Sequence, residues 1–473
     1  MIKLSNRHAT PFYIYITTVL LISCAIWSDT HAQVVQQKLP EKTRILFLLD
    51  GSGSMLASWG ASNRISTAKD MLTDLVDSLR GNQNLELALR VYGHIYRKSS
   101  QNCKDTRLEV GFGKQNHDQI INKLMTIMPK GTTPIAYSLE QGAADFPLAA
   151  GYRNIVIIIT DGIESCDGDP CAVSLALQKQ NIFLRPFIIG IGMDRDYKKQ
   201  FRCIGEYFDA RDIGDFKKAL STAIETSLKL TSASVELLDE DGKPRVTNVN
   251  VTFVNAFTGK PAFNFVHYRD RNGKPDSVQL DPVINYNVVA NTLPPVYKRN
   301  VKLIPGKHNV ITLSTPQGRL AISQKGTSAY GNAVKAIIRE ASKGESIHAQ
   351  DINSTQQYIT GTYDIEVLTT PRRFFNNTRI SQDKTTSISL PDPGILNLDN
   401  SSSGYGSLYE IMDSGEQQWV YDLSGNKGKE SIALQPGQYK IVFRVADAPG
   451  SKYTGIKTVK IESGRSTTMK LFN

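Results

Sequence analysis

Short apolar runs alternate with helical patterns from residue 44 to about residue 230, and this alternation limits the possible folds more than any other feature. The first run, Ile45–Leu49, contains no polar residue, as expected for a strand of a parallel sheet covered on both faces. A segment with apolar residues at helical spacing follows at 63–80. This order predicts an α/β domain with a doubly wound, mostly parallel sheet, in which ligands bind beyond the carboxyl ends of the strands.

The other elements of this domain, at 41–230, follow from the same periodicities. The pair Asp169-Pro170 is expected to open one of the helices, because Asp is a favoured N-cap and Pro is favoured in the first turn. We expect strands at 87–92, 106–110 (an edge strand), 154–160, 183–191 and 207–209, and helices at 117–128, 135–144, 172–180, 197–205 and 216–228.

After about residue 231 helical periodicity nearly vanishes, and β-favouring residues alternate with polar ones between turns. Tyr286, Tyr363 and Tyr439 each open a strand, and they lie 77 and 76 residues apart. Two further strands follow each of them at similar spacing. The repeat predicts three tandem, small all-β sandwich modules. The expected ranges are 231–315, 316–392 and 393–473. These modules resemble the Ig-like β-sandwich repeats of bacterial envelope proteins, of which the PEGA type is the nearest.

The amino terminus has the features of an export signal. Lys3 and Arg7 precede an apolar run that is too short to span a bilayer comfortably, and Ala32 ends a small-residue cleavage site. We therefore expect a signal peptide at 1–32 and a mature chain without a transmembrane span, located in the periplasm, at the cell surface or in the medium. Residues 21–24 also resemble a lipobox, so the alternative is a lipid anchor at Cys24, as in an outer-membrane lipoprotein.

Export changes how the cysteines are interpreted. The mature chain would keep Cys103, Cys166, Cys171 and Cys203, an even number in an oxidising compartment, which favours disulfides. Three pairings are open. The short separation favours Cys166–Cys171, which leaves Cys103–Cys203. A zinc site is disfavoured because the chain lacks a Cys-x-x-Cys motif and clustered histidines.

The net charge of +10 does not indicate a nucleic-acid partner. The excess of basic residues is diffuse, and the chain has no run of five or more like charges.

Polar residues follow the first strand in the pattern Asp50-x-Ser52-x-Ser54. A hard divalent cation such as Mg²⁺ takes about six oxygen ligands, and two serine hydroxyls two positions apart can turn toward one ion. Asp50 would supply charge directly or through a water. Two later segments have matching features: Thr133, with Thr132 as the fallback, precedes a short helix, and Asp161 ends the strand at 154–160.

Together the three segments resemble the metal-ion-dependent adhesion site of von Willebrand factor A domains. The resemblance covers about 190 residues. It implies a site for Mg²⁺, or alternatively Mn²⁺ or Ca²⁺, with a coordination position open to an acidic side chain of a protein partner. The ligands it implies are Asp50, Ser52, Ser54, Thr133 and Asp161.

Other polar residues near these segments have weaker indications. Glu164, Asp167 and Asp169 could line a second cation site, although we expect loop acids of this kind to be solvated. His94 and His117 have no partners at ligand spacing and are expected to be ordinary surface or packing residues.

We expect no enzymatic activity, because the sequence contains no nucleophile elbow, no His-Glu-x-x-His and no phosphate loop. The sequence favours an exported, cation-dependent module for protein binding, adhesion or envelope assembly. The first alternative is a subunit that recruits or regulates an envelope enzyme or transporter, similar to calcium-activated channel regulators. The second is a structural envelope protein in which the metal only stabilises the fold.

Overall fold

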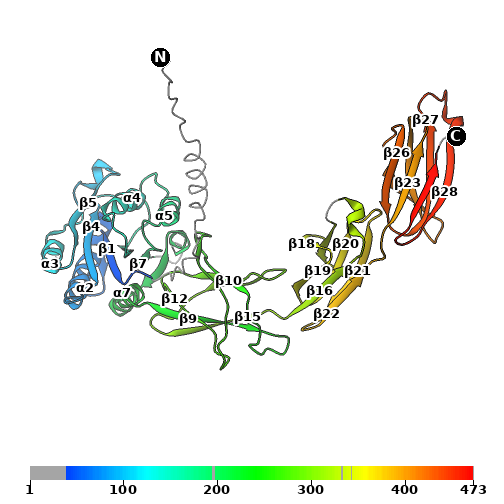
Figure 1. Cartoon of the computed structure of the whole chain (residues 1–473). Coiled ribbons are helices and arrows are strands. Elements are labelled where there is room, and N and C mark those ends of the chain that lie inside the picture. Colours follow the sequence, from blue (N-terminus) through cyan, green and yellow to red (C-terminus); the bar gives the residue numbers. More distant parts are fainter. Residues whose placement is uncertain (1–38, 194–197, 332–333, 342, 472–473) are drawn as a thin grey trace, which may run out of the picture. The chain divides into compact units, whose positions relative to one another are not determined.

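The computed structural model describes residues 39–193, 198–331, 334–341 and 343–471 (Figure 1). The predicted signal peptide at 1–32 and Cys24 lie outside the described residues. Within the described ranges, none of the helices combines the length and the apolar character needed to cross a membrane.

A six-stranded sheet forms the centre of the amino-terminal α/β domain. Its strands are β1 (Lys42–Asp50), β4 (Leu85–Tyr92), β5 (Thr106–Gly113), β6 (Tyr152–Thr160), β7 (Phe187–Ile191) and β8 (Glu206–Ala210). The order is β5-β4-β1-β6-β7-β8, and all neighbours are parallel except the edge strand β5, which runs antiparallel to β4. The predicted edge strand and the mostly parallel sheet are thus confirmed.

Helices cover both faces of this sheet (Figure 1). They are α2 (Arg64–Ser78), α3 (His117–Thr126), α4 (Ile135–Asp145), α5 (Pro170–Lys179), α6 (Lys198–Phe201) and α7 (Ile213–Leu228). Successive side chains of β1 point to opposite faces. Phe47 therefore packs in a core with α2, α3 and α7, whereas Leu46 and Leu48 pack in a second core with α4 and α5. A strand buried on both sides explains the apolar sequence of β1.

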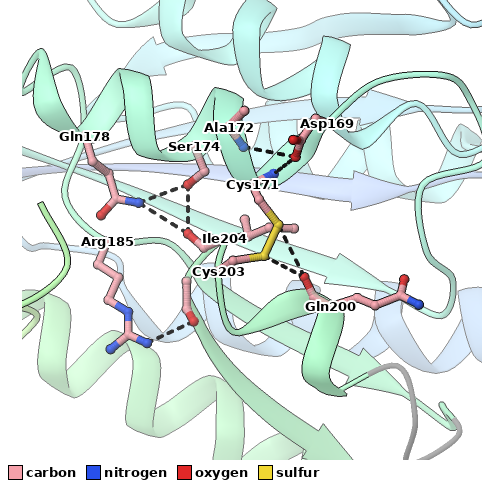
Figure 2. The surroundings of a disulfide bond; sticks show 10 residues. Asp169, Cys171, Ala172, Ser174, Gln178, Arg185, Gln200, Cys203 and Ile204 are labelled. Atoms are coloured by element: carbon pink, nitrogen blue, oxygen red, sulfur yellow. Dashed lines mark hydrogen bonds between the residues drawn. A yellow bond between two sulfur atoms is a disulfide. The ribbon is translucent and has the colours of Figure 1, made fainter.

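Local sequence sets where several helices begin. Asn63 accepts a hydrogen bond from the backbone N–H of Ser66 at the start of α2. Asp169 accepts from the N–H groups of Cys171 and Ala172, and Pro170 is the first residue of α5, as predicted (Figure 2). The helix therefore begins two residues before its predicted range of 172–180.

Two predicted elements are shorter than expected. The strand expected at 183–191 begins only at Phe187, and the helix expected at 197–205 is described as the single turn α6. Short elements also follow β1 and β4. They are the 3-10 turn η1 (Gly53–Leu56), the small hairpin of β2 (Ser58–Trp59) and β3 (Ser62–Asn63), and the turn η2 (Lys98–Ser100).

The region after residue 230 contains the same pair of sheets three times, one of three strands and one of four. The first repeat has β9 (Thr231–Leu238), β10 (Asn250–Asn255), β11 (Pro261–Val266), β12 (Ser277–Leu280), β13 (Tyr286–Ala290), β14 (Val296–Val301) and β15 (His308–Ser314), in sheets β12-β9-β15 and β11-β10-β13-β14. Apolar side chains from both sheets share one core, which is the arrangement of a β-sandwich.

The second and third repeats have the same strand order. The second has β16 (Gln317–Ser323), β17 (Lys335–Glu340), β18 (Ser346–Asp351), β19 (Ser354–Ile359), β20 (Gly361–Val367), β21 (Arg373–Ile380) and β22 (Thr385–Ser389), with the turn η4 (Thr327–Tyr330). The third has β23 (Gly394–Asn400), β24 (Gly404–Ile411), β25 (Gln417–Asp422), β26 (Gly428–Leu434), β27 (Gly437–Val445), β28 (Gly455–Ile461) and β29 (Ser466–Lys470), with the turn η5 (Ser451–Tyr453).

The three repeat tyrosines have the same role in each sandwich. Tyr286, Tyr363 and Tyr439 are buried, and each hydroxyl donates to a backbone carbonyl four or five residues upstream. The oxygen–oxygen distances are 3.0, 2.6 and 2.5 Å. This hydrogen bond resembles the tyrosine corner of immunoglobulin-type sandwiches. It explains the regular spacing of tyrosine in the sequence.

A buried ion pair joins the α/β domain to the first sandwich. Arg153 of β6 donates from two nitrogens to Asp281, at 2.6 and 2.7 Å, and from a third to the carbonyl of Ser227 at 2.5 Å. Both charged side chains are almost fully buried. A bidentate pair of this kind fixes one geometry, since each carboxylate oxygen faces its own N–H group.

Candidate metal centre

The candidate site lies at the carboxyl ends of β1 and β6, at the switch point of the sheet. The chain passes from β1 to β4 on one side, whereas β6 flanks β1 on the other, so loops from the two strands diverge there. Asp50 is the last residue of β1, and Asp161 directly follows β6. Because β1 and β6 are parallel neighbours, the two carboxylates meet at the same edge.

The oxygen atoms of the predicted ligands form a continuous chain of contacts. Asp50 accepts from the N–H of Ser52 and from the hydroxyl of Thr160, both at 2.7 Å. The hydroxyls of Ser52 and Ser54 are 2.9 Å apart, and Ser54 donates to Asp161 at 2.8 Å. The pattern after β1 and the aspartate after β6 are thus brought together, as the sequence predicted.

The loop that carries Thr133 is held against the first loop by backbone hydrogen bonds. The N–H of Gly53 donates to the carbonyl of Gly131 at 3.1 Å. The hydroxyl oxygens of Thr133 and Ser54 each lie 3.9 Å from the position that a Cβ atom on Gly162 would take. Both hydroxyls therefore border the same small space beside Asp161, which a glycine at position 162 leaves open.

The structure distinguishes the two threonines. The hydroxyl of Thr132 donates to the carbonyl of Asn102 at 3.0 Å and is used in that contact. Thr133 is buried and borders the space beside Ser54. The geometry therefore supports Thr133, and not the fallback Thr132, as the candidate ligand.

Two buried carboxylates share this site with one guanidinium group. Asp50 is completely buried, and burial together with the neighbouring charge of Asp161 raises its pKa to about 6. Arg64, at the start of α2, donates to Asp161 at 2.6 Å and to the carbonyl of Gly192 at 3.3 Å. The sequence analysis missed Arg64, since its distance in sequence from Asp161 gives no signal of the contact.

The donor set fits a hard divalent cation. All five predicted ligands offer carboxylate or hydroxyl oxygens, the atoms that Mg²⁺, Mn²⁺ and Ca²⁺ prefer, and no thiol or imidazole is among them. No group of three or more His, Cys, Asp or Glu side chains suited to a metal occurs among the described residues, so hydroxyls are essential to this site. Ser54 is exposed whereas Asp50, Ser52 and Thr133 are buried, so the oxygen cluster is open to solvent on the Ser54 side. Metal binding here stays a prediction.

All four cysteines of the domain form disulfides, but the pairing favoured by sequence separation is wrong. Cys103 is bonded to Cys166, and Cys171 to Cys203. The helix α5 begins between the two cysteines that lie close in sequence. Cys171 therefore lies in its first turn and faces Cys203 beyond α6, whereas Cys166 lies on the preceding loop (Figure 2).

The acidic residues beyond Asp161 cap helices. The carboxylate of Glu164 accepts from the N–H groups of Ala136, at 2.7 Å, and Cys166, at 2.9 Å. Glu164 is half-buried, and this burial raises its pKa. Our expectation that it is solvated is therefore wrong. Glu164 and Asp169 both accept from backbone N–H groups at helix starts, which does not favour a second cation site.

The two histidines of this domain are packing residues, as expected. His94 is buried and lies 2.7 Å from a carboxylate oxygen of Glu109, and burial lowers its pKa. His117 is buried at the start of α3.

Comparisons with known proteins agree with this fold and site. The family model for the von Willebrand factor type A domain matches residues 45–222. The uncharacterized protein YwmC of Bacillus subtilis (strain 168) is 30% identical over 197 residues, which is 40% of this chain and 85% of that protein. The uncharacterized protein YwmD of the same organism is 31% identical over 187 residues, 37% of this chain and 83% of that protein. The chain belongs to the von Willebrand factor type A domain family.

Solved structures with a similar fold include two proteins described by their likeness to this chain. BatB from Bacteroides thetaiotaomicron is 20% identical, with a TM-score of 0.33, over 39% of this chain and 98% of that chain. The mussel byssus proximal thread matrix protein 1, solved with a zinc-occupied adhesion-site motif, is 19% identical, with a TM-score of 0.31, over 39% of this chain and 45% of that chain.

Proposed function

We propose that this protein is an exported binding module, and not an enzyme, that holds an acidic group of a partner protein through a divalent cation. The observation that supports this most directly is the oxygen cluster at the switch point, with one exposed hydroxyl at its open side. The proposed ligands are Asp50, Ser52, Ser54, Thr133 and Asp161.

The charges around the site favour an acidic partner. A divalent cation held there supplies an electrophilic coordination position. The hydroxyl ligands are uncharged, and the charge of Asp161 is already shared with Arg64 at 2.6 Å. Two carboxylates, one guanidinium group and a doubly charged ion leave an excess of positive charge, which a carboxylate from a partner would neutralise in a partly desolvated setting.

Two observations support export and a binding role for the whole chain. Two disulfides in one domain suit an oxidising compartment such as the periplasm or the cell exterior. Three sandwich repeats would supply a spacer or further contact surfaces. A lipid anchor at Cys24 stays an alternative to cleavage after Ala32, and the mass of the mature amino terminus distinguishes the two.

Calorimetric titration of the full chain with Mn²⁺, alone, tests the metal site. We expect one bound ion per chain, lost in the S52A/S54A variant. Asp145→Asn is a suitable control, because Asp145 pairs with Arg90 and contacts none of the proposed ligands. Equal binding by wild type and S52A/S54A would contradict the proposed ligands.

Partner capture from an envelope fraction tests the function. We expect Mg²⁺ to be required, chelator to release the partner, and S54A to weaken capture while the chain stays folded. Capture that ignores both the chelator and S54A would favour the structural role, in which the metal only stabilises the fold. A captured partner that is itself an enzyme or a transporter would favour the recruiting role.

A further inference from the structure

We propose that the Cys103–Cys166 disulfide positions the metal ligand Thr133, so that metal affinity depends on this bond. This inference rests on the proposed metal site. It concerns a pair of residues that would not touch the ion and would act through the loop that carries one of its ligands.

The disulfide joins the loops that flank the Thr133 loop on both sides. Cys103 lies between β4 and β5, and Cys166 lies between β6 and α5, 63 residues further along the chain. Each cysteine directly follows a residue that holds one of the two threonines. Asn102 accepts from the hydroxyl of Thr132 at 3.0 Å. The hydroxyl of Ser165 accepts from the N–H of Thr133 at 2.7 Å.

A third hydrogen bond completes the arrangement, because the N–H of Ser165 donates to the carbonyl of Thr133 at 3.1 Å. Thr132 and Thr133 therefore belong to a closed ring of contacts in which the disulfide is the one covalent cross-link between the flanking loops. Opening that link would let the Asn102 side and the Ser165 side move apart. The backbone of Thr133 would then lose part of the support that directs its hydroxyl toward Ser54.

The loops keep other anchors if the disulfide is removed. The buried carboxylate of Asp105 accepts from the N–H groups of Ile95 and Tyr96, and Glu164 accepts from Ala136 and Cys166. These contacts hold both flanking loops to the domain without the cross-link. We therefore expect the protein without the bond to fold, with a loosened metal loop.

The second disulfide offers a matched control within the same domain. Cys171–Cys203 joins the first turn of α5 to the segment after α6 (Figure 2). Its surroundings in Figure 2 include Ser174, which donates to the carbonyl of Ile204 at 2.7 Å. None of the residues labelled there is a proposed metal ligand.

The experiment compares C103S/C166S with C171S/C203S in the full chain. Mn²⁺ affinity is measured by calorimetric titration, and melting is measured in chelator. Loss of a residue that orients a metal ligand typically lowers metal affinity by 10–100-fold, so we expect a rise in the Mn²⁺ dissociation constant of at least about tenfold for C103S/C166S. For C171S/C203S we expect lower melting in chelator and a dissociation constant within about twofold of wild type.

A folded C103S/C166S variant with wild-type affinity would overturn the inference, and so would an equal loss of affinity in both variants. If C103S/C166S does not fold, S165A decides the question, because it removes the acceptor for the N–H of Thr133 and leaves the disulfide intact. We expect S165A to raise the dissociation constant several-fold, and an unchanged value would overturn the inference. Absence of Mn²⁺ binding in wild type would instead contradict the metal site itself.

Discussion

Replacing Asp50 with Asn should stabilise the metal-free protein while abolishing its response to metal. Asp50 is completely buried and lies near a second carboxylate, and its pKa is raised from 3.8 to about 6. A raised pKa means that the ionised form is disfavoured in the folded state. At 1.36 kcal/mol per unit, the shift corresponds to a cost of about 3 kcal/mol at pH 7.

The amide of Asn can take over the contacts of the carboxylate. Its oxygen can accept from the N–H of Ser52, and its NH₂ group can donate to the hydroxyl of Thr160, which already lies 3.0 Å from the carbonyl of Gly162 and can donate there. Since some hydrogen-bond strength is lost, we expect a net gain of about 2 kcal/mol in chelator, or roughly 4–8 °C in the melting temperature of a domain of this size. The gain should vanish near pH 4, where the acid is protonated in both states.

Differential scanning calorimetry in chelator and in excess Mg²⁺ measures both effects. Asp161→Asn is the control: it should also lose the Mg²⁺ response, but it should destabilise the protein in chelator because it leaves Arg64 without its carboxylate partner. A D50N variant that melts below wild type in chelator would refute the reasoning about the buried charge. One that keeps the full Mg²⁺ response would show that Asp50 is not a ligand.

Three further predictions concern other parts of the molecule. T133V should lose most Mn²⁺ affinity, whereas T132V, which lacks only the hydroxyl bonded to Asn102, should lose several-fold at most; calorimetric titration compares them, and equal losses would contradict the ligand assignment. Burial lowers the pKa of His267, so the first sandwich should lose stability as the pH falls below about 6.5, and H267Q should flatten this dependence in denaturation curves taken across that range. D281N leaves Arg153 buried without its carboxylate and should cost about 3–5 kcal/mol in chemical denaturation, far more than D77N on the exposed Arg80 pair.

Local sequence predicted most of the elements that position the site. The apolar run before Asp50 is a strand buried on both faces, and Asp169-Pro170 starts α5, because side-chain periodicity and helix caps act over a few residues. The three loops of the metal motif could be recognised because each directly follows a strand or precedes a helix. The tyrosine repeat had a similar basis, since each Tyr donates to a carbonyl only four or five residues away.

Contacts between residues far apart in the chain were decided only by the tertiary structure. Sequence separation favoured Cys166–Cys171, yet the start of α5 directs Cys171 toward Cys203 and leaves Cys166 beside Cys103. The pairing of Arg64 with Asp161, 97 residues away, has no local signal either. The amino-acid sequence by itself determined which residues form strands, helices and oxygen-rich loops, since those preferences are local. How the loops meet, and which charges and thiols become neighbours, depends on the order of strands in the sheet and on the helices packed against it.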